Sequence, residues 1–133
     1  MAQFQLQIIT PDGPVFDGLV DSLLVRCVEG DVEILRGHAD YFAPLAVGRA
    51  RILIGNELKY AAVSGGFLSV IGGAVRLVPV TLEFAETIDE ARALSAKERA
   101  TEALETARDD KAIEIAKAKL SRALCRLNVA SLK

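Results

Sequence analysis

The sequence has no tryptophan, a single histidine and only two cysteines, and these absences exclude several functions. One histidine and two cysteines far apart in the chain form no cluster with the spacing of metal ligands, and no glycine-rich phosphate loop is present. His38 lies near Asp40, but a turn histidine is far more common than a catalytic dyad. We therefore predict no catalytic residues and no metal ligands.

Long apolar runs are also missing. The most apolar stretch, residues 61–80, is interrupted by four glycines and an arginine, which favours short strands over a membrane span. The N-terminal residues lack the basic stretch and apolar run of a signal peptide. We therefore expect a chain without membrane insertion, in which Cys27 and Cys125 are free thiols in a reducing compartment. A net charge of −2 argues against nucleic-acid binding.

Glycine, proline and aromatic residues are absent from the last third of the chain. All ten glycines, four prolines, five phenylalanines and two tyrosines lie at or before Phe84. Glycine and proline mark turns and aromatic residues favour strands, so their joint absence favours helix. The composition predicts an α+β protein with a β domain over residues 1–84 and a helical domain over residues 85–133.

Alternating apolar residues predict strands in the first domain. The stretches "QFQLQI" (3–8), "RARILI" (49–54) and "LKYAAV" (58–63) each place apolar side chains on one face. "TPDG" (10–13), Gly55-Asn56 and Gly72-Gly73 supply turns between them. Short strands with frequent turns predict a small antiparallel sandwich or barrel.

Two alanine-rich runs in the second domain predict an antiparallel two-helix hairpin or, if the turn straightens, one long rod. Thr87 followed by Glu90 is typical of a capping box, and "RDD" (108–110) separates the runs near Ala107 and Lys111. Apolar residues recur at heptad spacing in both runs. The two predicted seams are Ala93, Ala96, Ala100, Ala103 and Ala107 in the first run and Ile113, Ala116, Leu120, Ala123, Leu127 and Ala130 in the second.

Charge divides between the two predicted helices. Residues 86–110 carry eight acids and four bases, whereas residues 111–133 carry one acid and six bases. In an antiparallel hairpin the heptad positions place four arginines on one flank: Arg92, Arg99, Arg122 and Arg126. An arginine cluster without nearby carboxylates favours a bound anion such as phosphate. The alternative is an ordinary solvated flank of basic residues.

Several short motifs, in this order and spacing, resemble the epsilon subunit of bacterial F-type ATP synthases over the whole chain. They are "TPDGPVFDG" (10–18), "GHA" (37–39), "SGGF" (64–67), "AETIDEARA" (85–93) and "RLNVA" (126–130). The resemblance implies an N-terminal β-sandwich and a C-terminal helical hairpin. It further implies a non-catalytic central-stalk subunit, peripheral on the cytoplasmic face of the cell membrane, whose partners are the gamma subunit, the c-ring and the beta subunits.

Some members of that family bind ATP through an Ile-Asp-x-x-Arg-Ala signature, which is intact here. The resemblance implies ATP as a regulatory ligand, with no required cofactor, held by Glu83, Ile88, Asp89, Arg92, Ala93, Arg99, Arg122 and Arg126. It places Asp89 and Arg92 at the base end of the nucleotide and Arg99, Arg122 and Arg126 at its phosphates. In the family the basic helix extends towards an acidic loop of a beta subunit and blocks ATP hydrolysis.

The resemblance also implies contacts with neighbouring subunits. The expected partner contacts are Glu29, Asp31, His38, Lys111, Lys117 and Lys119. The loop that contains the first three departs from the family pattern, because Glu33, Arg36 and Asp40 replace a glycine and two prolines. Three other functions stay open at this point: an enzyme, a free-standing ATP sensor, and a structural stalk subunit that binds no nucleotide.

Overall fold

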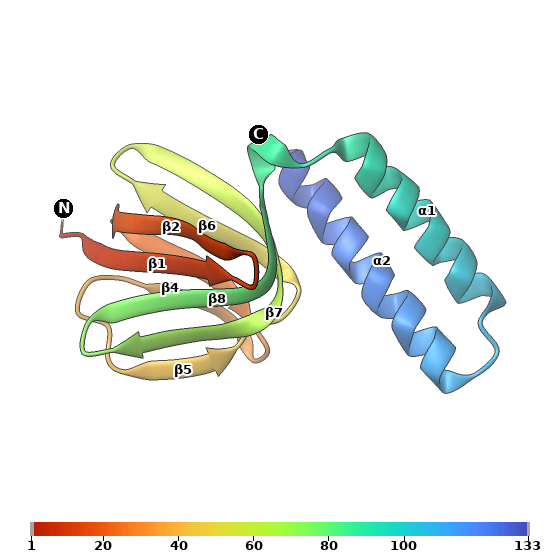
Figure 1. The fold of residues 1–133 in the computed structure, drawn as a ribbon, viewed down its shortest axis with the longest axis horizontal. Helices are drawn as coiled ribbons and strands as arrows, with labels where there is room; N and C mark the ends of the chain where they lie inside the picture. The colour runs from red at the N-terminus through yellow and green to blue at the C-terminus, as the bar shows by residue number, and fades with distance from the viewer. Residues whose placement is uncertain (1, 133) are drawn as a thin grey trace.

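Turns, several of them with glycine, divide the N-terminal part of the chain into eight strands in the computed structural model, which describes residues 2–132 (Figure 1). Met1 and Lys133, the outer ends of the two predicted domains, lie outside the described residues. The strands are β1 (Phe4–Thr10), β2 (Gly13–Val20), β3 (Ser22–Cys27), β4 (Gly30–Ile34), β5 (Tyr41–Pro44), β6 (Gly48–Ile54), β7 (Glu57–Ile71) and β8 (Ala74–Phe84).

The strands form a sandwich in which the long strands β7 and β8 contribute to both layers. The order is β2-β1-β8-β7-β6-β3-β4, and β5 pairs with β7 outside this path. The first half of β7 pairs with β6, whereas its second half, residues 67–70, pairs with β5. All pairs are antiparallel except β1 with β8, which is parallel. The predicted fold class is confirmed, with this one parallel pair as an addition.

Two glycines in the "SGGF" motif lie between the half of β7 that pairs with β6 and the half that pairs with β5. Gly65 and Gly66 have φ angles of +67° and +92°, a region that residues with a Cβ rarely adopt. A Cβ on Gly66 would lie 2.0 Å from the carbonyl oxygen of Val78 on β8. Glycine is therefore required here both for the backbone conformation and for the close approach of the neighbouring strand.

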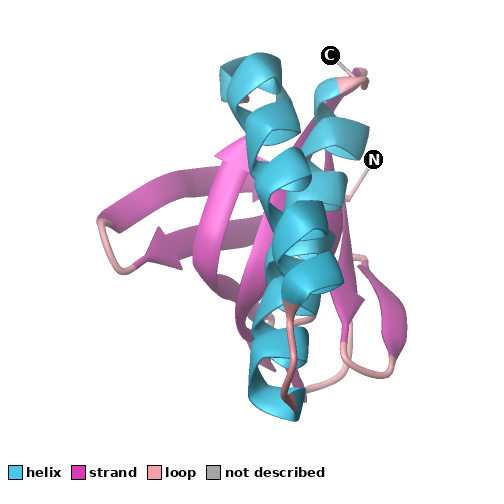
Figure 2. Ribbon diagram, turned by 90° about the vertical axis from the view of Figure 1, so that its right-hand side faces the viewer, coloured by secondary structure: helices cyan, strands magenta, loops and turns pink. Residues whose placement is uncertain are grey.

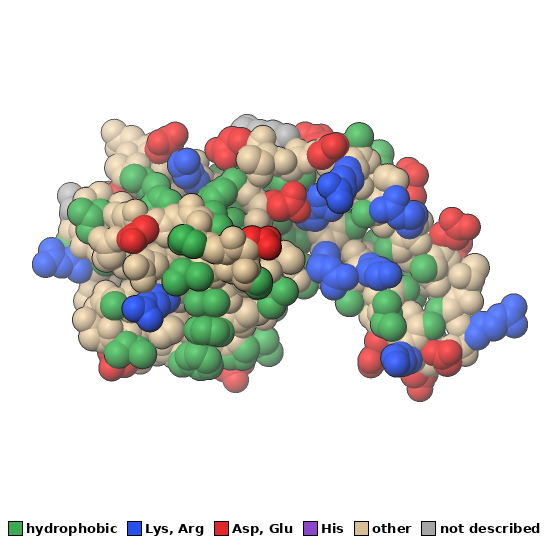
Figure 3. Space-filling view, viewed as in Figure 1, with side chains coloured by type: hydrophobic (Ala, Val, Ile, Leu, Met, Phe, Trp, Pro, Cys, Tyr) green, Lys and Arg blue, Asp and Glu red, His purple; other side chains and the backbone are tan. Residues whose placement is uncertain are grey.

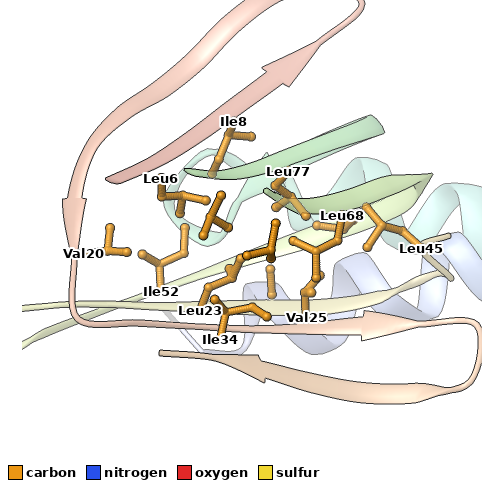
Figure 4. Close-up of a cluster of buried hydrophobic side chains, with 14 of the residues drawn as sticks. Leu6, Ile8, Val20, Leu23, Val25, Ile34, Leu45, Ile52, Leu68 and Leu77 are labelled. Carbon is orange, nitrogen blue, oxygen red and sulfur yellow. The ribbon is translucent and has the colours of Figure 1, made fainter. Parts of the chain in front are cut away.

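The hydrophobic core lies between the two layers of the sandwich (Figure 4). Leu6 and Ile8 from β1 meet Leu23, Ile52 and Leu77, and all five side chains are almost completely buried. Full burial of one such side chain contributes about 1.5–3 kcal/mol to stability. Because every buried residue of this cluster comes from the strands or the turns between them, the sandwich has a core of its own.

The helices α1 (Glu90–Thr106) and α2 (Asp110–Ala130) fold back on each other, so this structure has the hairpin and not the rod of the two predicted arrangements (Figures 1 and 2). Ala93 and Ala100 of α1 and Ala116 and Ala123 of α2 are buried, as the heptad spacing predicts. Two members of the predicted seams differ, because Ala103 is exposed and Ala130 is buried in a cluster with residues of the sandwich. Asp109 is the N-cap of α2, and its carboxylate accepts a hydrogen bond from the Ala112 amide at 2.8 Å. Neither helix, among the described residues, has the length and apolar character needed to cross a membrane.

The predicted capping box at Thr87 is wrong. Residues Ala85–Thr87 form a 3-10 turn, in which the Thr87 hydroxyl donates to the Phe84 carbonyl oxygen at 2.9 Å. Asp89 is the residue that caps α1, with its carboxylate accepting from the Arg92 amide at 3.1 Å. The physical reason is that Ile88, between Thr87 and Asp89, has an extended backbone and a buried side chain. The helix therefore begins after Ile88 in the chain, with Asp89 as its cap.

We expect residues 1–84 to fold without the helices, because the core cluster between the layers contains no helical residue. A chain that ends at Phe84 should unfold in one cooperative transition, measured by far-ultraviolet circular dichroism during a urea titration. A broad, non-cooperative loss of signal would contradict this expectation and would make the helices part of the sandwich core.

Candidate functional site

The C-terminal end of α2 docks on the sandwich through a small buried cluster. Val129 and Ala130 pack against Ala62 of β7 and against Ala85 and Ile88, which follow β8. All five are at most 7% exposed, and Val129 is completely buried. This second cluster is separate from the core between the layers. It fixes the hairpin beside one edge of the sandwich, where Figure 1 shows the helices.

An ion pair lies next to this docked end. Arg126 of α2 places its Nε 2.7 Å from Oε1 of Glu83, which belongs to β8. Its Nη2 donates to Oε2 of the same carboxylate at a longer distance of 3.4 Å. The Nε–H is buried but does not point at the oxygen, so this donor makes no hydrogen bond. The remaining N–H donors on the two Nη atoms of Arg126 are the ones left for a further acceptor.

A cleft of about 580 Å³ opens between the sandwich and the hairpin beside the ion pair. Figure 3 shows it as a hollow between the two parts, with Lys and Arg side chains at its edge. Its strand side contains Val47, Ala62, Val63, Ser64, Thr81 and Glu83, and its helix side contains Ala96, Arg99, Ala100, Ala103, Lys119, Arg122, Ala123, Cys125 and Arg126. Ligand sites of small molecules typically have volumes of about 300–1,000 Å³.

Positive charge dominates the helix side of the cleft. Four cationic side chains line the helix side, whereas the whole cleft has a single carboxylate, Glu83, on its strand side. Arg99 donates from Nη1 to the Ser95 hydroxyl at 3.0 Å, which uses one of its five donors. Arg122 is half-buried and forms no ion pair with the described residues. Guanidinium groups bind phosphate oxygens through paired hydrogen bonds, so the cleft suits a phosphorylated anion.

Apart from Glu83, the strand side of the cleft is uncharged. Ser64 and Thr81 lie directly opposite each other on β7 and β8 and bring hydroxyl groups, while Val47 and Val63 bring apolar surface. Cys125 faces the same space, and burial raises the pKa of its thiol, offset in part by a hydrogen bond with the Val63 backbone. The thiol is therefore uncharged at neutral pH. A wall without cations, whose one charged group is the Glu83 carboxylate, fits the base or sugar of a nucleotide better than its phosphates.

The eight predicted ligand residues fall into two groups. Glu83, Arg99, Arg122 and Arg126 line the cleft together. Ile88 and Ala93 are buried in the docking cluster and in the helix seam, respectively. Asp89 is the N-cap of α1, and Arg92 is exposed outside the cleft. Of the four arginines expected on one flank, Arg99, Arg122 and Arg126 line the cleft, whereas Arg92 is not among its lining residues.

Four polar residues of the cleft were not among the predicted ligands: Ser64, Thr81, Lys119 and Cys125. Lys119 precedes Arg122 by three residues on α2, and this spacing was the available signal that both face the same side. Ser64, Thr81 and Cys125 had no comparable signal, because strand register and hairpin docking bring them together. Residues 2–132 contain no group of His, Cys, Asp and Glu side chains suited to a metal ion.

The residues expected to contact neighbouring subunits are at the surface of the sandwich and of α2. Glu29 and Asp31 are exposed around the β3–β4 turn, where Asp31 pairs with Arg26 at 3.4 Å. His38 lies in the next loop, with its ring edge-on to Tyr41 at 5.8 Å between centroids. On the basic helix, the expected contacts Lys111 and Lys117 are exposed and lie outside the cleft, whereas Lys119 lines it.

Asp40 orders the loop that departs from the family pattern. Its carboxylate accepts a hydrogen bond at 2.9 Å from the Gly72 amide in the β7–β8 turn. Glu33, in β4, pairs with Arg51 of β6 at 3.2 Å. Asp40 and Glu33, two of the three positions at which the sequence was expected to differ from the family, are therefore held by polar contacts. Figure 1 shows the β7–β8 turn at the end of the sandwich away from the helices.

Two family models together match almost the whole chain. The model described as "ATP synthase, Delta/Epsilon chain, beta-sandwich domain" matches residues 3–85. The model described as "ATP synthase, Delta/Epsilon chain, long alpha-helix domain" matches residues 86–131. The chain is 43% identical over 130 residues to the ATP synthase epsilon chain of Bacillus velezensis, with 98% of each chain covered. It is 41% identical over 132 residues to that of Halalkalibacterium halodurans, again with 98% of each covered.

Solved structures show the same fold. A chain in the cryo-EM structure of the Euglena gracilis mitochondrial ATP synthase superimposes with a TM-score of 0.85 at 25% identity, covering 100% of this chain and 83% of that one. A chain in the central stalk and c-ring structure of the Tetrahymena thermophila mitochondrial ATP synthase gives a TM-score of 0.71 at 14% identity, with 97% of each chain covered. At that identity the second match shows the fold alone.

We predict that Val129→Ala releases the hairpin from the sandwich more often. The change removes two buried carbons, at about 0.8 kcal/mol per buried CH₂ plus the cost of the cavity, so docking should weaken by about 1–3 kcal/mol. Hydrogen exchange should become roughly 5–150 times faster for amides of α1 and α2 that exchange through undocking. Leu124→Ala is the matched control, because Leu124 is 45% exposed on the same helix. Equal acceleration in both variants would contradict the docking role of Val129.

Proposed function

The chain belongs to the delta/epsilon chain family of ATP synthases, and from this we propose that it is the regulatory epsilon-type subunit of a rotary proton-translocating F-type complex. Membership of the family makes it a stalk subunit of an ATP synthase. In the proposal the sandwich sits at the foot of the central stalk, on the cytoplasmic face of the cell membrane. There it couples the gamma subunit to the c-ring through the surface that carries Glu29, Asp31 and His38.

The cleft between sandwich and hairpin is the proposed ATP site. The observation that carries the proposal is its lining, in which Arg99, Arg122 and Arg126 converge from two helices on a space of ligand size. Glu83 neutralises only Arg126. An apo cleft with this excess of cations gains favourable contacts when a polyphosphate enters. No Walker lysine in a glycine-rich loop is present in the sequence, so ATP here is a ligand that is sensed and not hydrolysed.

The "IDEARA" segment acts at the root of the hairpin. Ile88 and Ala93 are buried there, so they set the position of α1 relative to the sandwich. Asp89 fixes the first turn of α1 through the Arg92 amide, and these two side chains are exposed near the start of the helix. We propose that the signature shapes the base end of the site, with Ile88 and Ala93 as positioning residues. Direct nucleotide contact by Asp89 and Arg92 stays a prediction.

ATP regulates the subunit in this proposal by holding the hairpin folded. A ligand that contacts both sandwich and helices stabilises the docked state by RT ln(1 + [L]/Kd). When ATP leaves, the basic helix α2 extends along the stalk and meets an acidic surface of a beta subunit, where it blocks ATP hydrolysis. The excess of bases in residues 111–133 supports this step, because Glu114 is their only acid. The alternative is a purely structural stalk subunit that binds no nucleotide.

We expect Arg122→Ala to weaken ATP binding about 10-fold to 150-fold. Loss of a hydrogen bond to a charged group costs about 1.5–3 kcal/mol, which corresponds to this range of affinity. Arg122 is the best position because it has no ion-pair partner among the described residues, so its removal leaves no carboxylate unpaired. Isothermal titration calorimetry of the isolated chain with ATP measures the effect.

Lys117→Ala is the matched control for that titration, because Lys117 lies on the same helix outside the cleft. Asp89→Asn provides a second comparison, since asparagine caps a helix as well as aspartate does. If the Asp89 carboxylate contacts ATP, this variant binds more weakly although it is less negative. Equal losses for Arg122→Ala and Lys117→Ala would contradict a shaped site and would leave a solvated basic flank.

Deletion of residues 111–133 should raise ATP hydrolysis by the assembled complex, because it removes the basic helix proposed to block the reaction. The measurement is the steady-state hydrolysis rate of complexes shown by gel electrophoresis to retain the shortened subunit. A deletion from residue 85 onward is the comparison, and the two should agree. Unchanged hydrolysis in both would favour the purely structural alternative.

A further inference from the structure

The connection between α1 and α2 consists of residues whose backbone can become helical. It contains Ala107, Arg108 and Asp109, and alanine and arginine are among the strongest helix formers. Helices commonly end on a residue with positive φ, most often glycine. Within residues 2–132 every positive φ belongs to a glycine, and the last of these is Gly73. Ala107 has a φ of −66°, which is already helical, so only its ψ of 134° departs from the helix.

The charges at the end of α1 do not favour a stop there. The macrodipole places negative partial charge at the C-terminal end of a helix, where basic side chains are stabilising. The last turn of α1 has no basic residue and contains Glu105. In one continuous helix Glu105 would precede Arg108 by three residues, which is a favourable pair. The charges therefore favour continuation of the helix over an end at Thr106.

The interaction that defines the turn belongs to α2. The Asp109 carboxylate accepts a hydrogen bond from the Ala112 amide at 2.8 Å, and its backbone carbonyl accepts from the Ile113 amide at 3.0 Å. In one continuous helix the Ala112 amide would donate to the carbonyl oxygen of Arg108, four residues earlier. The side-chain bond of Asp109 therefore exists only in the hairpin, whereas the Ile113 bond is common to both arrangements.

The packing between the two helices is small in area, so a single cap carries weight. Four alanines, Ala93, Ala100, Ala116 and Ala123, are the buried residues along the facing sides of the helices. Burial energy scales with apolar area, and alanine buries only a methyl group. The docking cluster that contains Val129 holds α2 at its other end, away from the turn (Figure 1).

We propose that the carboxylate cap of Asp109 holds the hairpin turn, and that its loss lets α1 and α2 fuse into one continuous helix. Val129 would then lie roughly 60 Å from the start of α1, at about 1.5 Å per residue, and could not reach the docking cluster. Asp109 is thus a positioning residue for the docked end of α2. The inference deepens the release of α2 proposed above and rests on that proposal for its effect on ATP hydrolysis.

The two native cysteines report this change in the full chain, without ligand or partner. Cys125 is partly buried against the docking cluster, whereas Cys27 is buried in the sandwich core. Modification by N-ethylmaleimide, followed by mass spectrometry, gives a rate for each thiol, and the rate for Cys125 follows the population of undocked hairpin. For Asp109→Ala we expect Cys125 to react about 2-fold to 30-fold faster. Cys27 should keep the rate of the parent chain, which shows that the sandwich is intact.

Two further variants separate helix fusion from other effects. Asp109→Asn removes the charge but keeps the cap, so Cys125 should react within about 2-fold of the parent rate. Arg108→Gly lies outside α2 and disfavours a continuous helix, because glycine is a poor helix former. When this change is added to Asp109→Ala, the rate for Cys125 should fall about 3-fold below that of Asp109→Ala alone.

Each contrary result overturns a defined statement. An unchanged rate for Cys125 in Asp109→Ala overturns the proposal, and so does equal acceleration in Asp109→Asn, because the charge and not the cap would then be responsible. If Arg108→Gly leaves the rate of Asp109→Ala unchanged, α2 frays without helix fusion and the proposal is wrong. Complexes assembled with Asp109→Ala should hydrolyse ATP more slowly than the parent. Unchanged hydrolysis together with faster Cys125 modification would leave the turn as proposed and overturn the inhibitory role of α2.

Discussion

The docking of the C-terminal end of α2 on the sandwich is the contact on which the candidate site depends. Val129 and its small neighbours hold the helix, and the pair between Arg126 and Glu83 adds a polar contact at the same place. One wall of the cleft belongs to the strands and the other to the helices. The cleft therefore exists only while the hairpin is docked. Binding of the proposed anion in the cleft would thus be thermodynamically coupled to docking of the hairpin.

The two clusters of buried residues give the two parts of the chain different stabilities. The sandwich buries large side chains such as Leu6, Ile52 and Leu77, whereas the hairpin and its root bury mostly alanine. Burial energy scales with apolar area, so the second interface is held by far less free energy than the first. Parts of a protein that move in regulation come from such regions of low local stability. The mobile element of the proposed mechanism is thus the weakly held one.

The strands and the hairpin could be predicted from sequence because their signals are local. Period-two alternation around Leu6 and the glycine turns predict strands, and alanines at heptad spacing predict the seam. The choice of Asp89 over Thr87 as helix cap was missed, because burial of Ile88 decides it. The pairing of Glu83 with Arg126 joins residues 43 apart in sequence through strand register and docking, which no local pattern encodes. The family resemblance identified both residues, but their contact required the structure.

The alanine seam has a thermodynamic consequence for the hairpin. Heat capacity rises when apolar surface becomes exposed to water, by about 0.45 cal/K/mol per Å². Helices that separate from an interface of alanines expose little such surface, whereas unfolding of the sandwich exposes a full core. The free energy of hairpin release should therefore vary almost linearly with temperature, while that of sandwich unfolding follows a curved profile with a maximum. Cooling and heating then change the state of the hairpin smoothly, within the range where the sandwich stays intact.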